Sequence, residues 1–218
     1  MTETQPPAAS GTTGPRGRPR RTAEQEAEMR ARIFAAARAL FAHEGYEGMS
    51  MRKLATAAEC APAALYSYFP NKRAVLHVLW EDIFADLAAR LADVAAATPD
   101  PVARLEGLTT TFVGYWLDHP DDYRAIFLIE DKLTSPGDTY FAQTSPSMQG
   151  ITLVHDAAEE ALAAGLIKAA SADEVAAMLL TAANGLALNL ITIPEFDWGD
   201  GPTLATRMIA TLVAGLKS

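Results

Sequence analysis

Residues 50–76 bring phenolic and cationic side chains together within a few turns of chain. Tyr66 and Tyr68 can donate hydroxyl hydrogens, and Lys72 an ammonium hydrogen, to anionic oxygens. Backbone N–H groups at the start of the helix that follows Asn71 can bind a further anion. This combination is typical of contacts to the phosphates of a nucleic-acid backbone, which hold a protein in register without reading sequence.

Two short helices must position these side chains. Ser50 is a good N-cap for a helix that starts at Met51, and Pro62 suits the first turn of a second helix that runs to about Phe69. Only about three residues, Glu59 to Ala61, join them. The segment 50–69 therefore predicts a helix-turn-helix, whose second helix can present its N-terminal end to a major groove.

The rest of the chain is also expected to be helical. Helix starts are predicted near Thr22, Asn71, Asp100, His119, Ser145, Ser171 and Pro202, and Gly45 is expected to end the first helix. No strand alternation, hairpin signal or fixed-period repeat is visible. We predict an all-α fold of about nine helices: a disordered basic arm (1–21), a helix-turn-helix domain (22–80) and a larger helical body (81–218).

Charge is divided unevenly between these parts. The net charge is −9, yet residues 1–80 hold 11 Lys/Arg against 7 Asp/Glu, and residues 81–218 hold 7 against 20. A basic head on an acidic body indicates that only the head meets a polyanion, although a chance fluctuation of surface charge would give the same count.

Cysteine content, the N-terminus and one long apolar segment bear on the compartment and on membrane insertion. The single cysteine, Cys60, fits a reducing cytoplasm, and the N-terminus lacks the apolar core of a signal peptide. Residues 175–193 are long and apolar enough to span a bilayer. Asn184 and Asn189 interrupt them and both flanks are acidic, which favours a helix buried in the body or in a subunit interface. We expect a cytoplasmic protein without a membrane segment.

Residues from about 28 to 80 resemble the DNA-binding domain of the TetR (tetracycline repressor) family of bacterial transcription regulators. The stretches that match are "IFAAARALFAHEGYEGMSM", "RKLATAAE" and "LYSYFPNKRAVL". In the body, "GYWLDHPDDYRAIF" (114–127) looks like a segment of effector domains in one class of the family. The resemblance implies a homodimer, double-stranded operator DNA and a small-molecule effector as partners, and a protein that sits on the nucleoid when bound.

The family pattern also implies a set of DNA-contacting residues. They are Arg52, Ala61, Pro62, Ala63, Tyr66, Ser67, Tyr68 and Lys72. Three positions depart from the pattern: Glu59 replaces a usual turn glycine, Ala61 a capping hydroxyl, and Ala64 a threonine. The arm carries Arg18 and Arg20 beside Gly and Pro, which resembles a minor-groove hook, although a non-specific basic tail explains it equally well.

Aromatic and polar residues of the body are candidates for an effector cavity, with ordinary core packing as the alternative for each. They are Trp80, Phe84, Phe112, Tyr115, Trp116, Phe127, His155 and Asn184. Apolar stripes on the last two helices predict the dimer interface, unless they face their own core. These are Leu179, Leu186, Leu190, Leu204, Met208 and Leu212.

Evidence for an enzyme is weak. The four histidines form no zinc-binding pattern, the acids around Pro120 suit helix capping, and no phosphate-binding glycine loop is present. We expect no catalytic residue, no metal site and no cofactor. The sequence favours a repressor released from a pseudo-palindromic operator by an apolar or aromatic effector. A constitutive DNA-binding regulator is the alternative, and a helical enzyme the least favoured.

Overall fold

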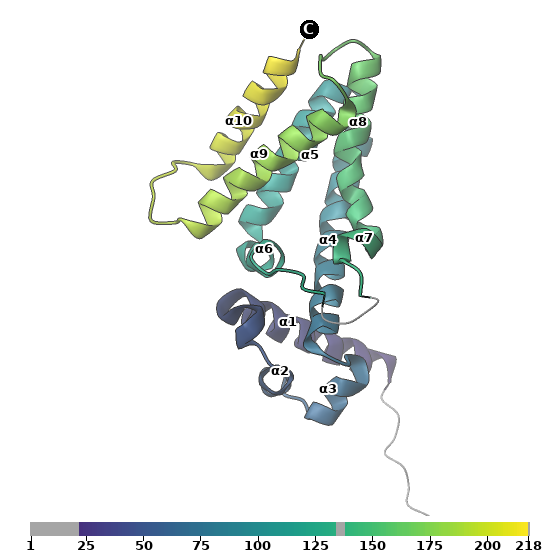
Figure 1. Cartoon of the computed structure of the whole chain (residues 1–218), viewed down its shortest axis with the longest axis vertical. Coiled ribbons are helices and arrows are strands. Elements are labelled where there is room, and N and C mark those ends of the chain that lie inside the picture. Colours follow the sequence, from purple (N-terminus) through teal and green to yellow (C-terminus); the bar gives the residue numbers. More distant parts are fainter. Residues whose placement is uncertain (1–21, 134–137, 218) are drawn as a thin grey trace, which may run out of the picture.

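The computed structural model describes residues 22–133 and 138–217, and these fold into helices that form an elongated molecule (Figure 1). The all-α prediction is confirmed, since the described residues hold ten α-helices, one 3-10 helix and no strand beyond an isolated bridge between Ile167 and Lys217. The elements are α1 (Ala23–Gly48), α2 (Met51–Ala57), α3 (Pro62–Tyr68), α4 (Lys72–Ala97), α5 (Pro101–Asp118), α6 (Pro120–Phe127), α7 (Phe141–Thr144), η1 (Pro146–Ile151), α8 (Thr152–Ala163), α9 (Ala172–Thr192) and α10 (Gly201–Leu216).

Side-chain caps begin most of the long helices where the sequence predicts them. In each case an oxygen of the capping residue accepts a hydrogen bond from the backbone N–H three residues later. The caps are Thr22, Ser50, Asn71, Asp100 and Ser171. Such a cap is worth about 1 kcal/mol. Gly45 does not end α1 outright: with φ of +68° it kinks the helix, which resumes up to Gly48.

Helices α1, α2 and α3 form a head at one end of the molecule, and α4 runs from this head into the body (Figure 1). Leu54 of α2 and Leu65 of α3 are fully buried. Burying a leucine contributes about 2 kcal/mol, so these side chains fasten the two short helices to the head. The path of α4 makes it the one helix that belongs to both the head and the body.

The body is built around α5, which packs against α4, α8, α9 and α10. The segment that raised the membrane question is α9, a 21-residue helix packed on α5, α8 and α10. It is long and apolar enough to cross a membrane, but within the structure 39% of its most apolar window is buried. The other residues of that window are half-buried or exposed.

The segment before α8 differs from the prediction. One helix was expected from Ser145, whereas the chain forms α7, then η1, and only then α8. Tertiary contacts explain the difference, because Glu81 of α4 accepts hydrogen bonds from Ser145 and Ser147. A Cβ on Gly150 would lie 2.5 Å from Ala88 Cβ, so the glycine allows η1 to approach α4 closely.

Candidate functional site

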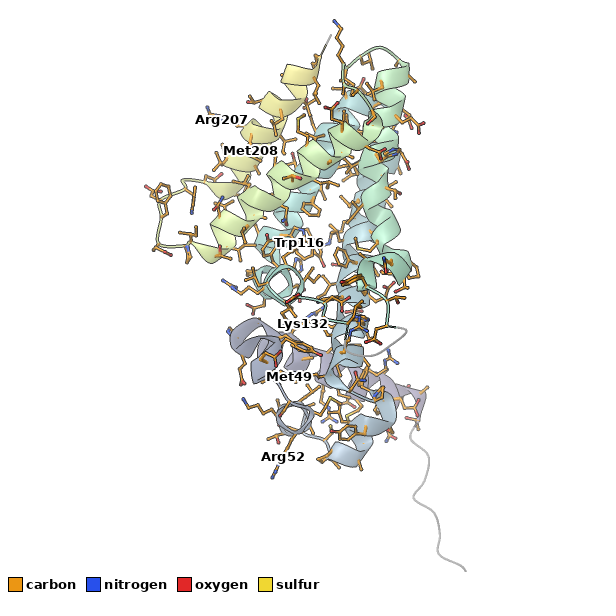
Figure 2. The ribbon with its side chains drawn as sticks, in the orientation of Figure 1. Met49, Arg52, Trp116, Lys132, Arg207 and Met208 are labelled. Atoms are coloured by element: carbon orange, nitrogen blue, oxygen red, sulfur yellow. The ribbon has the colours of Figure 1, made fainter. Side chains whose placement is uncertain are left out.

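The outer face of the head is formed by α2 and the first turns of α3. Figure 2 shows Arg52 extending from α2 into solvent at the end of the molecule farthest from the body. Most of the expected DNA-contacting side chains share this exposed face, namely Arg52, Ala61, Pro62, Ala63, Tyr66 and Ser67. Tyr66 is 54% exposed, so its hydroxyl is free to meet an anion. Arg18 and Arg20 lie outside the described residues.

Lys72 has a second role that the sequence did not indicate. Its ammonium donates to Tyr46 O at 3.0 Å, lies 4.0 Å from the centre of the Tyr46 ring and 3.7 Å from Glu47. The Lys72 side chain is 28% exposed. Tyr68, the last residue of α3, is half-buried. Lys72 therefore fastens the first turn of α4 to the end of α1 while part of it still faces solvent.

A buried ion pair joins the head to the body. Arg38 of α1 places Nε 2.8 Å from Asp122 Oδ1 in α6, and its Nη2 lies 3.1 Å from Asp82 Oδ2 in α4. The Arg38 Nε–H does not point at the carboxylate, so the contact is an ion pair rather than an aligned hydrogen bond. Burial raises the pKa of Asp122, and the Arg38 guanidinium opposes that rise.

A second link between the body and the start of α4 centres on Asp131. Its carboxylate accepts hydrogen bonds from Arg73 at 2.8 Å and from the Phe141 backbone N–H at 2.7 Å, and His77 Nε2 lies at 3.0 Å. Burial alone would raise the pKa of Asp131, but these hydrogen bonds outweigh it and hold the pKa below its usual value. Neither this cluster nor the Arg38–Asp122 pair has a local sequence signal, because the acid and its basic partners are more than 50 residues apart in sequence.

A cavity of about 440 Å³ lies in the body, between α4, α5, α6, η1 and α9. Its lining contains no charged side chain and is formed by Phe84, Phe112, Phe127, Met148, Ile151, Leu180, Thr181, Asn184 and Gly185. Its size and apolar wall are typical of a small-molecule site.

Four of the eight expected effector residues line this cavity: Phe84, Phe112, Phe127 and Asn184. The other four, Trp80, Tyr115, Trp116 and His155, do not. Trp80 and Tyr115 are buried and donate hydrogen bonds to the backbone oxygens of Ala125 and Ile83. They are core residues.

Trp116 lies directly behind the cavity wall rather than in it. Its ring packs edge-on against Phe84, Phe112 and Phe127, with ring centres 6.1, 5.9 and 5.2 Å away. The residue is fully buried, and its indole Nε1 has no hydrogen-bond partner among the described residues. An unpartnered buried donor costs about 1–3 kcal/mol, so the indole behind the wall is a polar group that the described residues leave unsatisfied.

Tyr123 of α6 holds the polar residue of the cavity. Its hydroxyl donates to Asn184 Oδ1 at 3.1 Å and to Asn184 O at 3.2 Å. Burial raises the pKa of Tyr123 to about 12, so the hydroxyl keeps its proton at neutral pH.

The expected interface residues fall into two groups. Leu179 and Leu186 are buried, at 0% and 8% exposure, because their face of α9 packs inside the subunit, so they are not available to a partner. The other four, Leu190, Leu204, Met208 and Leu212, are half-buried at the rim of the core.

No cluster of three or more His, Cys, Asp or Glu that could hold a metal occurs in the part of the chain that the structure describes. Cys60 is half-buried in the turn between α2 and α3.

Known proteins resemble the head most clearly. The sequence model described as "Bacterial regulatory proteins, tetR family" matches residues 33–79. The repressor KstR2 of Rhodococcus jostii (strain RHA1) is 29% identical over 106 residues, which are 49% of this chain and 47% of that protein. KstR2 of Mycobacterium tuberculosis (strain ATCC 25618 / H37Rv) is 31% identical over 88 residues, which are 40% of this chain and 44% of that protein. The matched region spans about half the length of these curated relatives. The head of the chain is thus similar to the TetR family.

Solved structures extend the similarity to the whole TetR fold. The regulator FadR from Bacillus subtilis, in complex with stearoyl-CoA, superposes with a TM-score of 0.73 at 17% identity, covering 85% of this chain and 98% of that one. A protein of unknown function from Rhodococcus sp. RHA1 superposes with a TM-score of 0.71 at 24% identity, covering 87% of this chain and 96% of that one. At these identities the similarity shows the fold alone.

One departure from the TetR pattern has a measurable conformation. Glu59, in place of the usual turn glycine, has φ of +51° and is the sole non-glycine residue with positive φ in the described ranges. The turn therefore keeps the left-handed conformation that glycine adopts at least cost. Ala61 begins α3 without a side-chain cap.

Proposed function

We propose that the chain is a homodimeric, ligand-responsive transcription regulator, a repressor that leaves a pseudo-palindromic operator when an apolar small molecule enters the body. The match of the head to the TetR family and the similarity to relatives named as transcriptional repressors support this proposal. The observation that carries it is the position of Phe84: this residue lines the cavity on the same helix, α4, whose first turn lies in the head.

The DNA-binding part of the proposal rests on the exposed face of α2 and α3. Arg52 is the cation on that face, and Tyr66 is its exposed phenol. The backbone N–H groups at the start of α4 supply further donors for phosphate. Two such heads, related by the symmetry of a dimer, would read half-sites one helical turn apart.

A continuous path of contacts supports a response to ligand. Phe84 stacks on Phe141 with ring centres 5.8 Å apart, and the Phe141 N–H is bonded to Asp131. Asp131 in turn holds Arg73, the neighbour of Lys72 in the first turn of α4. A ligand that displaces Phe84 would disturb the Asp131 cluster and change the angle of the head.

We assign the dimer contact to one surface. It consists of the half-buried stripe on α10 (Leu204, Met208 and Leu212) and the exposed Met178 and Leu188 of α9. Apolar surface of this kind on two adjacent helices suits an isologous four-helix contact. We also propose a cytoplasmic location, because the operator DNA of a bacterial regulator lies in the cytoplasm.

Gly185 provides the experiment that tests the ligand response. It lines the cavity, and a Cβ built on it meets no atom within 4 Å, so a side chain at this position begins in open space and Gly185→Leu should occupy part of the cavity. An operator is first selected from random duplex DNA, and apolar compounds are then screened for release of the protein. Gly185→Leu should still bind the operator but no longer respond to the compounds.

Gly215→Leu is the matched control, because Gly215 is an exposed helical glycine that also has open space around its Cβ position. It should respond to the compounds as the wild type does. A wild-type protein that binds DNA but is released by no compound is a constitutive regulator, and this result refutes the ligand-responsive part of the proposal.

A further inference from the structure

Among the residues lining the cavity, Asn184 carries the side-chain amide, and its environment orients it. The Tyr123 hydroxyl donates to Asn184 Oδ1, which occupies the acceptor end of the amide. The Asn184 Nδ2 group has no hydrogen-bond partner among the residues that the structure describes, although asparagine offers two N–H donors there. The wall therefore presents a free donor whose direction Tyr123 fixes.

The rest of the wall is unsuited to an anion. No lysine, arginine or histidine lines the cavity. Residues 81–218 carry 7 Lys/Arg against 20 Asp/Glu, so the body repels negative charge.

The cations of the body are also committed elsewhere. Five of the seven form ion pairs with acids: Arg90, Arg104, Arg124, Lys132 and Lys217. The backbone of Lys168 is fixed beside the end of α10, where the Lys168 backbone N–H donates to Leu216 O. Arg207 is exposed and extends outward from α10 (Figure 2), and it does not line the cavity. A ligand with several phosphates would find no counter-charge at the cavity.

We infer that the cavity selects an uncharged apolar molecule bearing one hydrogen-bond acceptor, such as a ketone or ester oxygen, and that Asn184 is the residue that recognises this acceptor. This inference rests on the proposed function, since it names the ligand class of the same cavity. It also separates this chain from the FadR fold relative whose structure holds stearoyl-CoA, because a coenzyme A thioester carries a polyanionic group.

The test compares three probes of equal chain length: a straight-chain methyl ketone, the corresponding alkane and the corresponding acyl-CoA. Binding to the full-length protein is measured by calorimetry and by release of operator DNA. The ketone should bind wild type roughly three- to tenfold more tightly than the alkane, the usual gain from one hydrogen bond. The acyl-CoA should bind more weakly than the ketone.

Two variants assign the preference to the amide. Asn184→Leu keeps the side-chain size but removes the donor, so the ketone and the alkane should bind equally. Tyr123→Phe keeps the ring but frees the Asn184 amide to rotate, so the preference for the ketone should shrink while binding of the alkane is unchanged. Retention of the full preference in Asn184→Leu overturns the inference.

The outcomes separate this inference from the proposed function. If Gly185→Leu abolishes binding of all probes but wild type binds the acyl-CoA best, or binds ketone and alkane equally, the inference is wrong and the cavity remains the effector site. If wild type binds none of the probes and no compound of the wider screen releases it from the operator, the inference and the ligand-responsive part of the proposed function are both wrong.

Discussion

Arg38 in α1 and Asp122 in α6 face each other across the junction of head and body, with Nε and Oδ1 2.8 Å apart. The Asp122 side chain is only 7% exposed, and that of Arg38 is 38% exposed. Breaking a buried ion pair leaves an uncompensated charge, whereas an exposed pair contributes little.

Arg38→Met should therefore lower the free energy of unfolding by roughly 3 kcal/mol, because it leaves the Asp122 carboxylate buried without its cation. Urea unfolding measures this loss. Arg90→Met is the matched control: Arg90 pairs with Asp86 on one exposed helix face, and its loss should cost less than about 0.5 kcal/mol. Equal effects of the two changes would show that the Arg38–Asp122 pair does not hold the junction.

The Asp131 cluster makes stability depend on pH in a defined direction. The pKa of Asp131 is lowered in the folded state, so the unfolded chain takes up the proton first as pH falls. The stabilisation is complete above the unfolded pKa of about 3.9 and is lost as pH falls through the lower folded value.

Asp131→Asn should thus destabilise the protein at neutral pH, and the difference from wild type should narrow below about pH 4. Urea titrations at several pH values follow this difference. Asp93→Asn, at an exposed position of α4, should cause little change at any pH. A difference for Asp131→Asn that stays constant down to low pH would argue against ionic stabilisation.

The strained turn between α2 and α3 is a place where a substitution should increase the stability of the protein. Glu59 holds φ at +51°, which costs a residue with a Cβ about 1 kcal/mol. Glu59→Gly should raise the free energy of unfolding by up to this amount. Glu59→Ala removes the same carboxylate but keeps the Cβ, so it should bring no gain. If both variants raise the free energy of unfolding equally, the effect comes from removal of the charge and not from relief of backbone strain.

Assembly can be tested on α10. Met208 is half-buried on the stripe assigned to the interface, and Figure 2 shows it on this outer helix. Met208→Glu should convert dimers to monomers in sedimentation experiments, because it places a charge in a buried apolar contact. Thr203→Glu, at an exposed position in the first turn of the same helix, should leave the dimer intact. A wild type that is monomeric at micromolar concentration contradicts the assignment.

Local signals in the sequence were enough to place most helices. The caps at Thr22, Ser50, Asn71, Asp100 and Ser171 depend on a side chain and a backbone N–H three residues apart, so they can be read from short stretches of sequence. The 3-10 helix η1 could not be predicted in this way. It depends on Glu81 and Ala88 of α4, which are distant in sequence.

The cavity was only partly predictable for the same reason. Periodicity identifies Phe112 and Trp116 as one face of α5, but not which ring lines the cavity and which lies behind it. The partners that fix Asn184 and Asp131 come from other helices or from distant parts of the chain. Their roles follow from packing and have no local pattern.

The central claim, that the α2–α3 face of the head reads DNA, is tested most directly by two exposed arginines. Arg52 extends from the head and Arg207 from the body, and both are drawn in Figure 2. Each is changed to alanine, and fluorescence anisotropy measures affinity for a selected operator and for variants with altered bases. Arg52→Ala should weaken operator binding and relax the preference for one base, at a cost of about 1–3 kcal/mol. Arg207→Ala should bind as wild type does. If the two variants bind with equal affinity and equal base preference, the head face described here is not the DNA-reading surface.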